Sequence, residues 1–175
     1  YATVYEYDGV DLIRKTDALS RETVYEYYTD SPLAHKVKKI TYPGGETAEY
    51  AYDEKGNAVS ETKSYLSEQS VVTREYYPDG KLKKATDANG NAAEYTYTAF
   101  GETASVSDAV GAKTYAYDNN GRLAAETDEN GVVTRYERYL DGKLKTKRVI
   151  AGGETLYRED YSYDIAGNLI RKETE

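Results

Sequence analysis

Residues 115–123 read Tyr-Ala-Tyr-Asp-Asn-Asn-Gly-Arg-Leu, and this pattern recurs along the chain. Side chains alternate between the two sides of a β-strand, so both tyrosines of a Tyr-x-Tyr strand share one face. The Asp-x-x-Gly that follows is typical of a tight turn, because Asp bonds the backbone just ahead of it and Gly accepts a positive φ. A returning strand begins at Leu123. The pattern therefore predicts a β-hairpin.

Copies of the pattern divide the chain into similar units. Their second tyrosines are interpreted as Tyr7, Tyr27, Tyr52, Tyr77, Tyr97, Tyr117, Tyr139 and Tyr163, which stand 20 to 25 residues apart. The longer intervals are expected to arise from longer turns near Ser64–Ser70 and Ile150–Gly153. Such spacing predicts one tandem array of about seven to eight units over residues 1–175, with about sixteen strands. The chain is interpreted as a fragment of a longer protein.

The recurring residues are predicted to be structural positions of the array. The tyrosine positions are Tyr5, Tyr7, Tyr50, Tyr52, Tyr95, Tyr97, Tyr115, Tyr117, Tyr161 and Tyr163. The turn and return positions are Asp53, Asp118, Asp164, Gly56, Gly80, Gly121, Gly167, Leu82, Leu123 and Leu169. The chain has 21 Tyr but one Phe and no Trp. Since each buried Tyr removes roughly 150–250 Å² from water, tyrosine should drive folding.

No apolar set recurs at helical spacing, so the fold class is predicted to be all-β. About sixteen strands side by side would exceed the ~10 strands that open twisted sheets usually reach. We therefore expect a curled antiparallel sheet, a partial β-shell, with tyrosines on its concave side and their hydroxyls facing water. Ala125 is expected beside Leu123 on the apolar side of the return strand, with Arg122 and Glu126 facing solvent. A four-bladed propeller is a less favoured alternative, because the spacing is irregular.

Three Asn-Gly pairs, at residues 89–90, 120–121 and 130–131, are the strongest hairpin signals in the chain. The run Asp87-Ala-Asn-Gly-Asn faintly resembles a calcium loop, but Thr98 stands where the twelfth-position glutamate of an EF-hand is required. A hairpin turn is the favoured interpretation there. The single histidine, His35, has no ligand-type neighbours and is expected in a surface loop.

Composition disfavours several function classes. The net charge of −8 and the scattered Lys and Arg residues argue against nucleic acid. The sequence has no long apolar stretch, so membrane insertion is not expected. Without Cys there is neither a disulfide framework nor a thiolate metal site. No nucleophile with an activating base and no phosphate loop is found. We therefore expect no catalytic residues, no metal and no cofactor, and we do not expect an enzyme.

The unit at 115–123 resembles the signature of YD-repeat proteins, also called RHS-repeat proteins. The Gly-x-Leu ends at 80–82 and 167–169 match the same signature, whereas Tyr28, Thr98 and Leu140 depart from it at the Asp position. The resemblance implies long arrays of hairpins that wind into a hollow shell. In bacterial polymorphic toxins and insecticidal toxin complexes the shell encloses a toxic polypeptide. In teneurins a similar shell serves adhesion.

The resemblance thus implies a non-catalytic wall segment of a hollow β-shell that encapsulates a polypeptide cargo such as a toxin domain. The alternative is an extracellular adhesion or carbohydrate-binding repeat module, since aromatic ladders can stack sugar rings. Expected partners are neighbouring repeats of the parent shell and an enclosed polypeptide, and the expected location is secreted or at the cell surface. Exposed strand edges also predict self-association of the isolated chain.

Overall fold

The structure is a computed structural model of the chain, and it describes residues 2–175. Every regular element among these residues is a β-strand, and the strands form one antiparallel sheet in sequence order, β1 to β16. The predicted all-β fold of tandem hairpins is therefore confirmed. The propeller alternative is wrong, because its blades would be separate sheets. No helix in residues 2–175 has the length and apolar character needed to cross a membrane.

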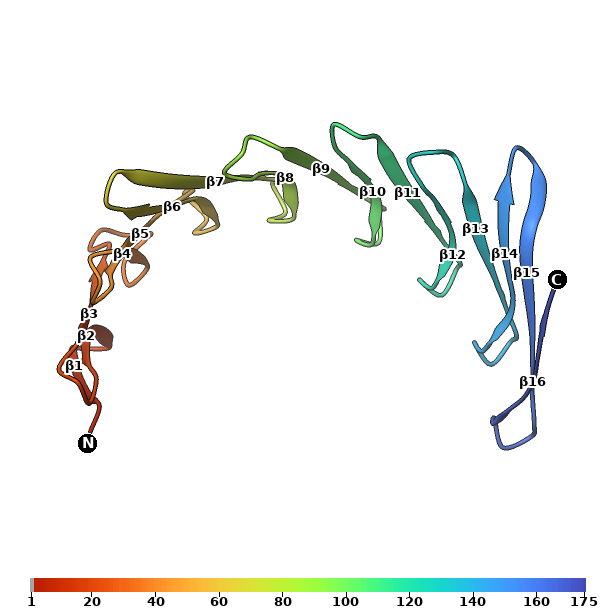
Figure 1. Ribbon diagram of the computed structural model, residues 1–175, viewed down its shortest axis with the longest axis horizontal. Coiled ribbons are helices and arrows are strands. Elements are labelled where there is room, and N and C mark those ends of the chain that lie inside the picture. Colours follow the sequence, from red (N-terminus) through yellow and green to blue (C-terminus); the bar gives the residue numbers. More distant parts are fainter. Residues whose placement is uncertain (1) are drawn as a thin grey trace. The chain divides into compact units, whose positions relative to one another are not determined.

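The chain divides into two compact units that meet at Ala92–Ala93, and in each of them successive strands lie side by side (Figure 1). The strands that lie wholly within the first unit are β1 Val4–Asp8, β2 Asp11–Thr16, β3 Glu22–Tyr27, β4 Val37–Thr41, β5 Thr47–Tyr52, β6 Ala58–Tyr65, β7 Glu68–Tyr76 and β8 Leu82–Thr86. The remaining strands are β9 Ala92–Tyr97, β10 Thr103–Ser107, β11 Ala112–Tyr117, β12 Leu123–Thr127, β13 Val133–Arg138, β14 Leu144–Ala151, β15 Glu154–Tyr163 and β16 Leu169–Thr174.

The turn after β11 shows how the Asp-x-x-Gly sequence closes a hairpin. The Gly121 N–H donates to the Asp118 carbonyl at 2.9 Å, and the Asp118 N–H donates to the Arg122 carbonyl at 2.8 Å. Gly121 has a φ of 73°, whereas Asn120 does not have a positive φ. This is the three-residue connection of a type I turn followed by a left-handed glycine, rather than the two-residue Asn-Gly turn that such pairs often form. The hairpin signal is correct, and the glycine alone takes the left-handed conformation.

A β-bulge accompanies the hairpins that follow Tyr-x-Tyr, and it changes which side chains share a face. Opposite β11, Ala116 pairs with Ala125 but Tyr117 pairs with Leu123, so Ala124 is an extra residue. An extra residue reverses the alternation beyond it. Glu126 therefore lies on the side of Tyr115, with which it pairs, and Ala125 lies on the opposite side. The prediction that Ala125 joins the apolar side and Glu126 faces away from it is wrong.

Insertions lengthen strands more often than turns. Within Ser64–Ser70, Tyr65 pairs directly with Glu68, so β6 and β7 simply continue to a short turn. Ala151 pairs with Glu154 in the same way between β14 and β15. Longer turns at these two places were the wrong prediction, because the added residues gain ladder hydrogen bonds as strand. The long connection lies instead between β3 and β4, where the Tyr28 N–H donates to the Lys36 carbonyl.

In two repeats the second-tyrosine position lies one residue earlier in the sequence than predicted. Tyr76, not Tyr77, pairs with Leu82, and Tyr77 opens the turn by accepting from the Gly80 N–H. In the same way Arg138 pairs with Leu144, and Tyr139 opens the turn to Gly142. The second-tyrosine assignments of Tyr77 and Tyr139 are therefore wrong. Both residues stand at the turn position that Asp occupies in other units.

The sheet has almost no dry core. Among residues 2–175, Ala48 is the only buried hydrophobic residue, and Thr146 and Glu159 are the buried polar ones. No large side chain in this range is fully buried. The strands at both ends of the array, β1 and β16, are exposed along their whole length. A single layer of strands leaves both of its sides within reach of solvent, so stability must come from contacts along the layer.

Candidate functional site: the tyrosine face and the hairpin junctions

In each of the two compact units, the tyrosines of the strands lie on one side of the sheet, here called the tyrosine face. Directly paired residues of an antiparallel ladder point to the same side, and so do residues two apart on a strand. By this rule the tyrosine face of the first unit carries Tyr5, Tyr7, Tyr25, Tyr27, Tyr50, Tyr52 and Tyr76. That of the second unit carries Tyr95, Tyr97, Tyr115, Tyr117, Tyr136, Tyr157, Tyr161 and Tyr163.

The reverse side, here called the polar face, has a different chemistry. In the second unit it carries Glu137, Thr146, Arg148, Arg158 and Asp160. Arg148 contacts Glu137 at 2.8 Å, and Thr146 donates to Asp160 at 2.8 Å. Hydrogen bonds from Thr146 and Arg158 lower the pKa of Asp160. The sheet therefore separates an aromatic side from a side of paired charges and hydroxyls.

Neighbouring hairpins are joined by a tyrosine hydroxyl where their ladder ends. The β10–β11 ladder runs only from Ser105 to Ser107, and beyond it the Tyr117 hydroxyl donates to the Thr103 carbonyl at 2.9 Å. The same bond recurs from Tyr27 to Leu12, Tyr52 to Val37 and Tyr76 to Ala58, at 2.9–3.0 Å. Each accepting carbonyl belongs to the residue beside the bulge, where the ladder is disrupted. The second tyrosine of the pattern thus closes a gap in the backbone hydrogen bonding.

These bonds correct the expected role of the hydroxyls. We predicted that the hydroxyls face water in a hollow interior, since a buried hydroxyl without a partner costs about 1–3 kcal/mol. The four hydroxyls of Tyr27, Tyr52, Tyr76 and Tyr117 instead donate to main-chain carbonyls of the preceding hairpin. Burial is the first cause of the raised pKa of Tyr27, Tyr52 and Tyr117. The hydroxyl is therefore a structural donor.

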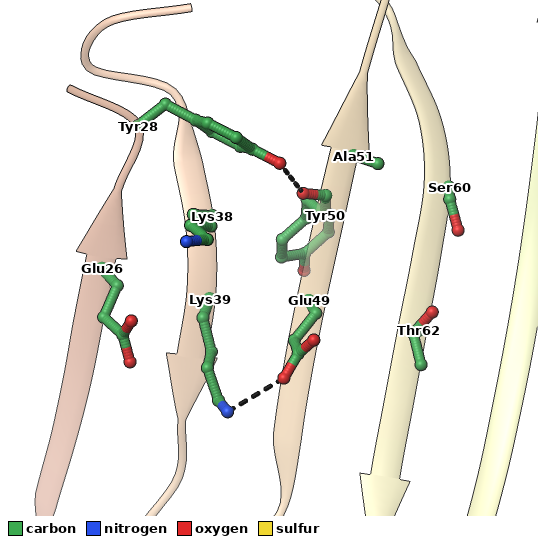
Figure 2. Close-up of a pocket in the computed structure, with 9 residues that line it drawn as sticks. All are labelled: Glu26, Tyr28, Lys38, Lys39, Glu49, Tyr50, Ala51, Ser60 and Thr62. Atoms are coloured by element: carbon green, nitrogen blue, oxygen red, sulfur yellow. Dashed lines mark hydrogen bonds and ion pairs between the residues drawn. The ribbon is translucent and has the colours of Figure 1, made fainter. Parts of the chain in front are cut away.

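Two tyrosines at the turn position make a second kind of bond between hairpins. The Tyr28 hydroxyl donates to the Tyr50 carbonyl at 3.0 Å, and Figure 2 shows its ring reaching across β4 to β5. Its ring also meets Tyr52 edge-to-face, with centroids 5.9 Å apart. Tyr139 repeats this geometry, with a hydroxyl bond to Tyr161 at 3.0 Å and an edge contact with Tyr163 at 6.2 Å. A turn aspartate bonds the backbone of its own hairpin, whereas these two turn tyrosines bond the next hairpin instead.

Lysines cover the rings at these two junctions. Lys36 lies 5.6 Å from the Tyr52 ring centroid and Lys38 lies 5.9 Å from that of Tyr28. The corresponding distances are 5.6 Å from Lys143 to Tyr163 and 5.9 Å from Lys145 to Tyr139. A cation within about 6 Å of an aromatic centroid is attracted to the ring. The Lys-x-Lys sequence after a turn tyrosine therefore belongs to the same junction.

A groove of about 390 Å³ opens beside the Tyr28 junction. Its lining is Glu26, Tyr28, Lys38, Lys39, Glu49, Tyr50, Ala51, Ser60 and Thr62 (Figure 2). Of the four charged residues that line it, Lys39 and Glu49 form an ion pair and lie 2.9 Å apart across β4 and β5. Glu49 is the first cause of the raised pKa of Lys39. Because Lys39 and Glu49 neutralise each other, this pair offers little free charge to a ligand.

Two glutamates lie on the tyrosine face and bind its hydroxyls. Glu159 is only 5% exposed and accepts from Tyr157 at 2.7 Å and Tyr161 at 2.6 Å, with Lys172 as its ion-pair partner. Hydrogen bonds from Lys172, Tyr161 and Tyr157 lower the pKa of Glu159 to about 2. Glu126 accepts from Tyr136 at 2.7 Å. Burial, followed by that bond, raises the pKa of Tyr136 to about 12.

The turn aspartates predicted from sequence lie at the start of their hairpin turns. Asp53 Oδ1 accepts from the N–H groups of Lys55 and Asn57 at 3.0 and 2.9 Å, and its Oδ2 accepts from the Asn57 side chain at 2.8 Å. The bond from the Asn57 side chain is the first cause of the lowered pKa of Asp53. Asp118 and Asp164 also accept from the backbone N–H four residues ahead, at 3.0 and 2.8 Å.

The other predicted positions fall into two places. Gly56, Gly80, Gly121 and Gly167 all close turns with φ between 73° and 89°. Leu82, Leu123 and Leu169 open their return strands opposite Tyr76, Tyr117 and Tyr163. Tyr5 and Tyr7, on the end strand β1, are 51% and 61% exposed. The predicted tyrosines therefore lie along one side of their unit instead of converging on one point.

Sequence reasoning missed the residues that join hairpins in other ways. Arg138 stands in the second-tyrosine position and donates to the Leu123 carbonyl at 3.3 Å. The sequence pattern identifies Tyr28 only as a departure at the Asp position and assigns Tyr139 as a second tyrosine, so neither link to the next hairpin was predicted. Glu159 had a readable signal, because it alternates with Tyr157 and Tyr161 on one strand. Glu126 had none, since the bulge that turns it toward Tyr136 leaves no mark in the apolar pattern.

The remaining candidates behave as turn residues. His35 lies in the long β3–β4 connection with Nδ1 2.9 Å from Asp11 Oδ2, as the expected loop residue. Asp87 accepts from the N–H groups of Asn89 and Asn91, so the faint calcium-loop resemblance occupies a hairpin turn. Within residues 2–175 no group of three or more His, Cys, Asp or Glu side chains is arranged to hold a metal ion.

Comparison with known proteins identifies the repeat. The family model for the RHS repeat matches residues 76–113, 98–133 and 117–155. Double-stranded DNA deaminase toxin A from Burkholderia cenocepacia is 27% identical over 107 residues, which are 61% of this chain and 7% of that protein. This chain therefore spans only a small part of the length of that relative.

Solved structures share the fold at low sequence identity. A TcdB2-TccC3-TEV crystal structure matches with a TM-score of 0.78 and 16% identity, covering 99% of this chain and 10% of that one. The Photorhabdus luminescens Tc holotoxin pore matches with a TM-score of 0.68 and 16% identity, covering 99% of this chain and 11% of that one. Residues 76–155 therefore match the RHS repeat, and the solved structures share the fold of the chain.

Proposed function

We propose that this chain is one tandem array forming part of the wall of a hollow RHS shell, and that the shell encloses a polypeptide such as a toxin domain. The observation that carries the proposal is the single layer of strands without a dry core. A layer of this kind has two usable sides and no interior of its own. It is suited to separating one compartment from another.

The two sides support this role by their chemistry. The tyrosine face offers half-buried aromatic rings, and charges on it such as Glu159 and Lys172 are paired, so it can contact apolar segments of an unfolded or partly folded chain. The polar face carries ion pairs and hydroxyls, which suit contact with bulk water. Repetition of one hairpin extends both sides without limit, because each hairpin contacts only its neighbours. The structural role needs no catalytic group, no metal and no cofactor.

The proposal is tested by asking which side of the wall is enclosed. This chain has no Cys, so once any cysteines elsewhere in the parent protein are replaced, a single introduced thiol reports one position. Ser70 lies on the tyrosine face, where it pairs with Lys63, and the adjacent Gln69 pairs with Ser64 on the polar face. In the full-length parent protein, Ser70→Cys and Gln69→Cys would be labelled with a small maleimide and with a bulky polymer maleimide.

We expect the small reagent to label both variants and the bulky reagent to label only Gln69→Cys. Unfolding the parent in urea should make both thiols react with the bulky reagent, which controls for intrinsic reactivity. Equal labelling of the two folded variants by the bulky reagent would contradict an enclosed tyrosine face. Mass spectrometry of the shell after mild proteolysis would then identify any polypeptide retained inside.

An extracellular adhesion or carbohydrate-binding role remains the alternative. The bonds of the second tyrosines do not favour it, because hydroxyls committed to main-chain carbonyls are less available to a sugar. Saturable glycan binding that is lost on Tyr115→Ala, with the fold intact, would support this alternative. A secreted or cell-surface location fits either role and is proposed with them.

A further inference from the structure

The three Asn-Gly pairs are chemically vulnerable sequences in exposed positions. Asn89, Asn120 and Asn130 are each followed by glycine and exposed to solvent. In such a pair the glycine nitrogen attacks the asparagine side-chain carbonyl carbon, since glycine has no Cβ to hinder it. A C–N bond forms and the side-chain nitrogen leaves as ammonia. Water then opens the five-membered imide to aspartate or isoaspartate.

All three pairs have the same two backbone restraints. The glycine N–H, which belongs to the attacking nitrogen, donates to a turn aspartate carbonyl: Gly90 to Asp87 at 3.0 Å, Gly121 to Asp118 at 2.9 Å and Gly131 to Asp128 at 3.0 Å. The asparagine N–H donates to Oδ1 of the same aspartate, at 2.9 Å for Asn89, 2.8 Å for Asn120 and 3.0 Å for Asn130. Both peptide groups that flank the asparagine are therefore held by one residue.

Ring closure requires the peptide plane between asparagine and glycine to rotate so that the nitrogen faces the side chain. In the Asp118 turn that rotation breaks the bond from Gly121 to Asp118 and disturbs the left-handed φ of 73° at Gly121. The carboxylate opposes it further, because Asp118 Oδ1 also accepts from the Arg122 N–H at 3.0 Å and so ties both ends of the turn. Attack therefore has to wait for local opening of the turn.

We propose that the first aspartate of these turns is a positioning residue that protects the following Asn-Gly pair from deamidation. Each of the three pairs, which begin at Asn89, Asn120 and Asn130, is protected by the aspartate two residues before it: Asp87, Asp118 and Asp128. The turn thus resolves a conflict within the repeat, because the glycine that lets the hairpin close would otherwise leave a fast-degrading bond on the surface. The device would extend the chemical lifetime of a repeat array in which these three Asn-Gly pairs are exposed to solvent.

The test follows deamidation of the whole chain at mildly alkaline pH by peptide mapping and isoaspartate detection. We expect each Asn-Gly pair to react at least about tenfold more slowly in the native chain than in urea, because attack needs an opened turn. Asp118→Ala should raise the rate at Asn120 by about threefold to tenfold, since two backbone bonds to its carboxylate are lost. Asn89 and Asn130 serve as internal controls and should keep their rates.

Two matched variants separate positioning from general loosening. Asp118→Asn keeps an oxygen acceptor at the same place and should retain most of the protection at Asn120. Asp164→Ala removes the equivalent bond to Asn168 in a turn without an Asn-Gly pair, and it should leave all three rates unchanged. Equal rates in native and unfolded chains, or uniform acceleration of all three pairs by Asp118→Ala, would overturn the proposal. So would an unchanged rate at Asn120 in that variant.

Discussion

At the scale of single residues, the hydroxyl of the second tyrosine makes a hydrogen bond between hairpins that the ring alone cannot make. It donates to a carbonyl beside the bulge of the preceding hairpin, as Tyr117 does to Thr103 and Tyr52 does to Val37. A main-chain carbonyl displaced from its ladder needs a donor from elsewhere. Because the donor sits on the next hairpin, satisfying that carbonyl also fixes how two hairpins meet.

Removing one such hydroxyl should weaken the array measurably. Tyr117→Phe keeps the ring but deletes the donor, so we expect a loss of about 1 kcal/mol in the free energy of unfolding. Urea denaturation followed by circular dichroism measures it. Tyr7→Phe, on the exposed end strand, is the control and should change the stability little. A loss of the same size in both variants would argue against the carbonyl bond as the cause.

Arg138 allows the reverse test, in which the recurring tyrosine is introduced, because Arg138 occupies the second-tyrosine position and makes only a long hydrogen bond there. Its Nη2 reaches the Leu123 carbonyl at 3.3 Å, while its Nε is buried without a hydrogen-bond partner among residues 2–175. Arg138→Tyr restores the recurring donor and removes the unsatisfied N–H, so we expect stabilisation by about 0.5–2 kcal/mol. Thermal and urea unfolding report it. Arg135→Tyr, on the polar face of the same strand, should not stabilise the chain.

At the scale of elements, the hairpins differ in how they hold their neighbours. Turns that begin with Asp are capped within the hairpin, as at Asp53. Turns that begin with Tyr28 or Tyr139 reach the next hairpin through a hydroxyl and a ring. The exchange of Asp for Tyr at one position therefore converts local stabilisation into coupling between elements. Lys-x-Lys after the turn accompanies the second kind.

Glu159 joins the last two strands, β15 and β16, and makes their pairing depend on pH. Its folded pKa of about 2 lies below the ordinary value of 4.5. The stability it contributes is therefore present above about pH 4.5 and is lost as the pH falls toward 2. Glu159→Gln lacks this contribution, so the difference in unfolding free energy from the parent chain should be large at pH 6 and smaller at pH 3.

Urea unfolding at the two pH values measures that difference. The turn carboxylates titrate in both proteins and cancel from the comparison. Glu173→Gln, on the exposed strand β16, is the matched control and should show little difference at either pH. A difference between Glu159→Gln and the parent that stays constant from pH 6 to pH 3 would contradict the assigned role of the ionised carboxylate.

At the scale of the whole molecule, the array ends in strands with nothing paired on their outer edges. Within the described residues β1 pairs with β2 and β16 pairs with β15, and both end strands are exposed. Unpaired edges present rows of N–H and C=O groups that invite another strand. In a longer array the neighbouring repeats would occupy these edges. The isolated chain leaves them open to a second copy of itself.

Self-association should therefore depend on an edge and not on apolar exposure in general. We expect sedimentation velocity to show concentration-dependent oligomers of the chain, and Ile170→Lys on β16 to shift it toward monomer, since an edge charge opposes pairing. Ile165→Lys makes the same chemical change at an exposed turn and should leave association unchanged. A chain that stays monomeric over a wide concentration range would refute edge pairing.

The sequence by itself determined the hairpins, their order and the shared side of the tyrosines. Tyr-x-Tyr and Asp-x-x-Gly act through neighbours a few residues away, and alternation along a strand needs no tertiary information. That is why the regular unit at 115–123 was predicted correctly, including the turn at Asp118 and the return strand from Leu123. The predicted faces of Ala125 and Glu126, on that return strand, were wrong because of a bulge that alternation cannot reveal.

Only the tertiary structure decided how one hairpin holds the next. The bonds from Tyr28 to Tyr50 and from Tyr117 to Thr103 join residues 22 and 14 positions apart. They form because the ladder between hairpins stops short and leaves a carbonyl without a donor. Where the ladder stops depends on the bulge and on the twist between two strands, which belong to the pair of hairpins and not to either sequence segment alone.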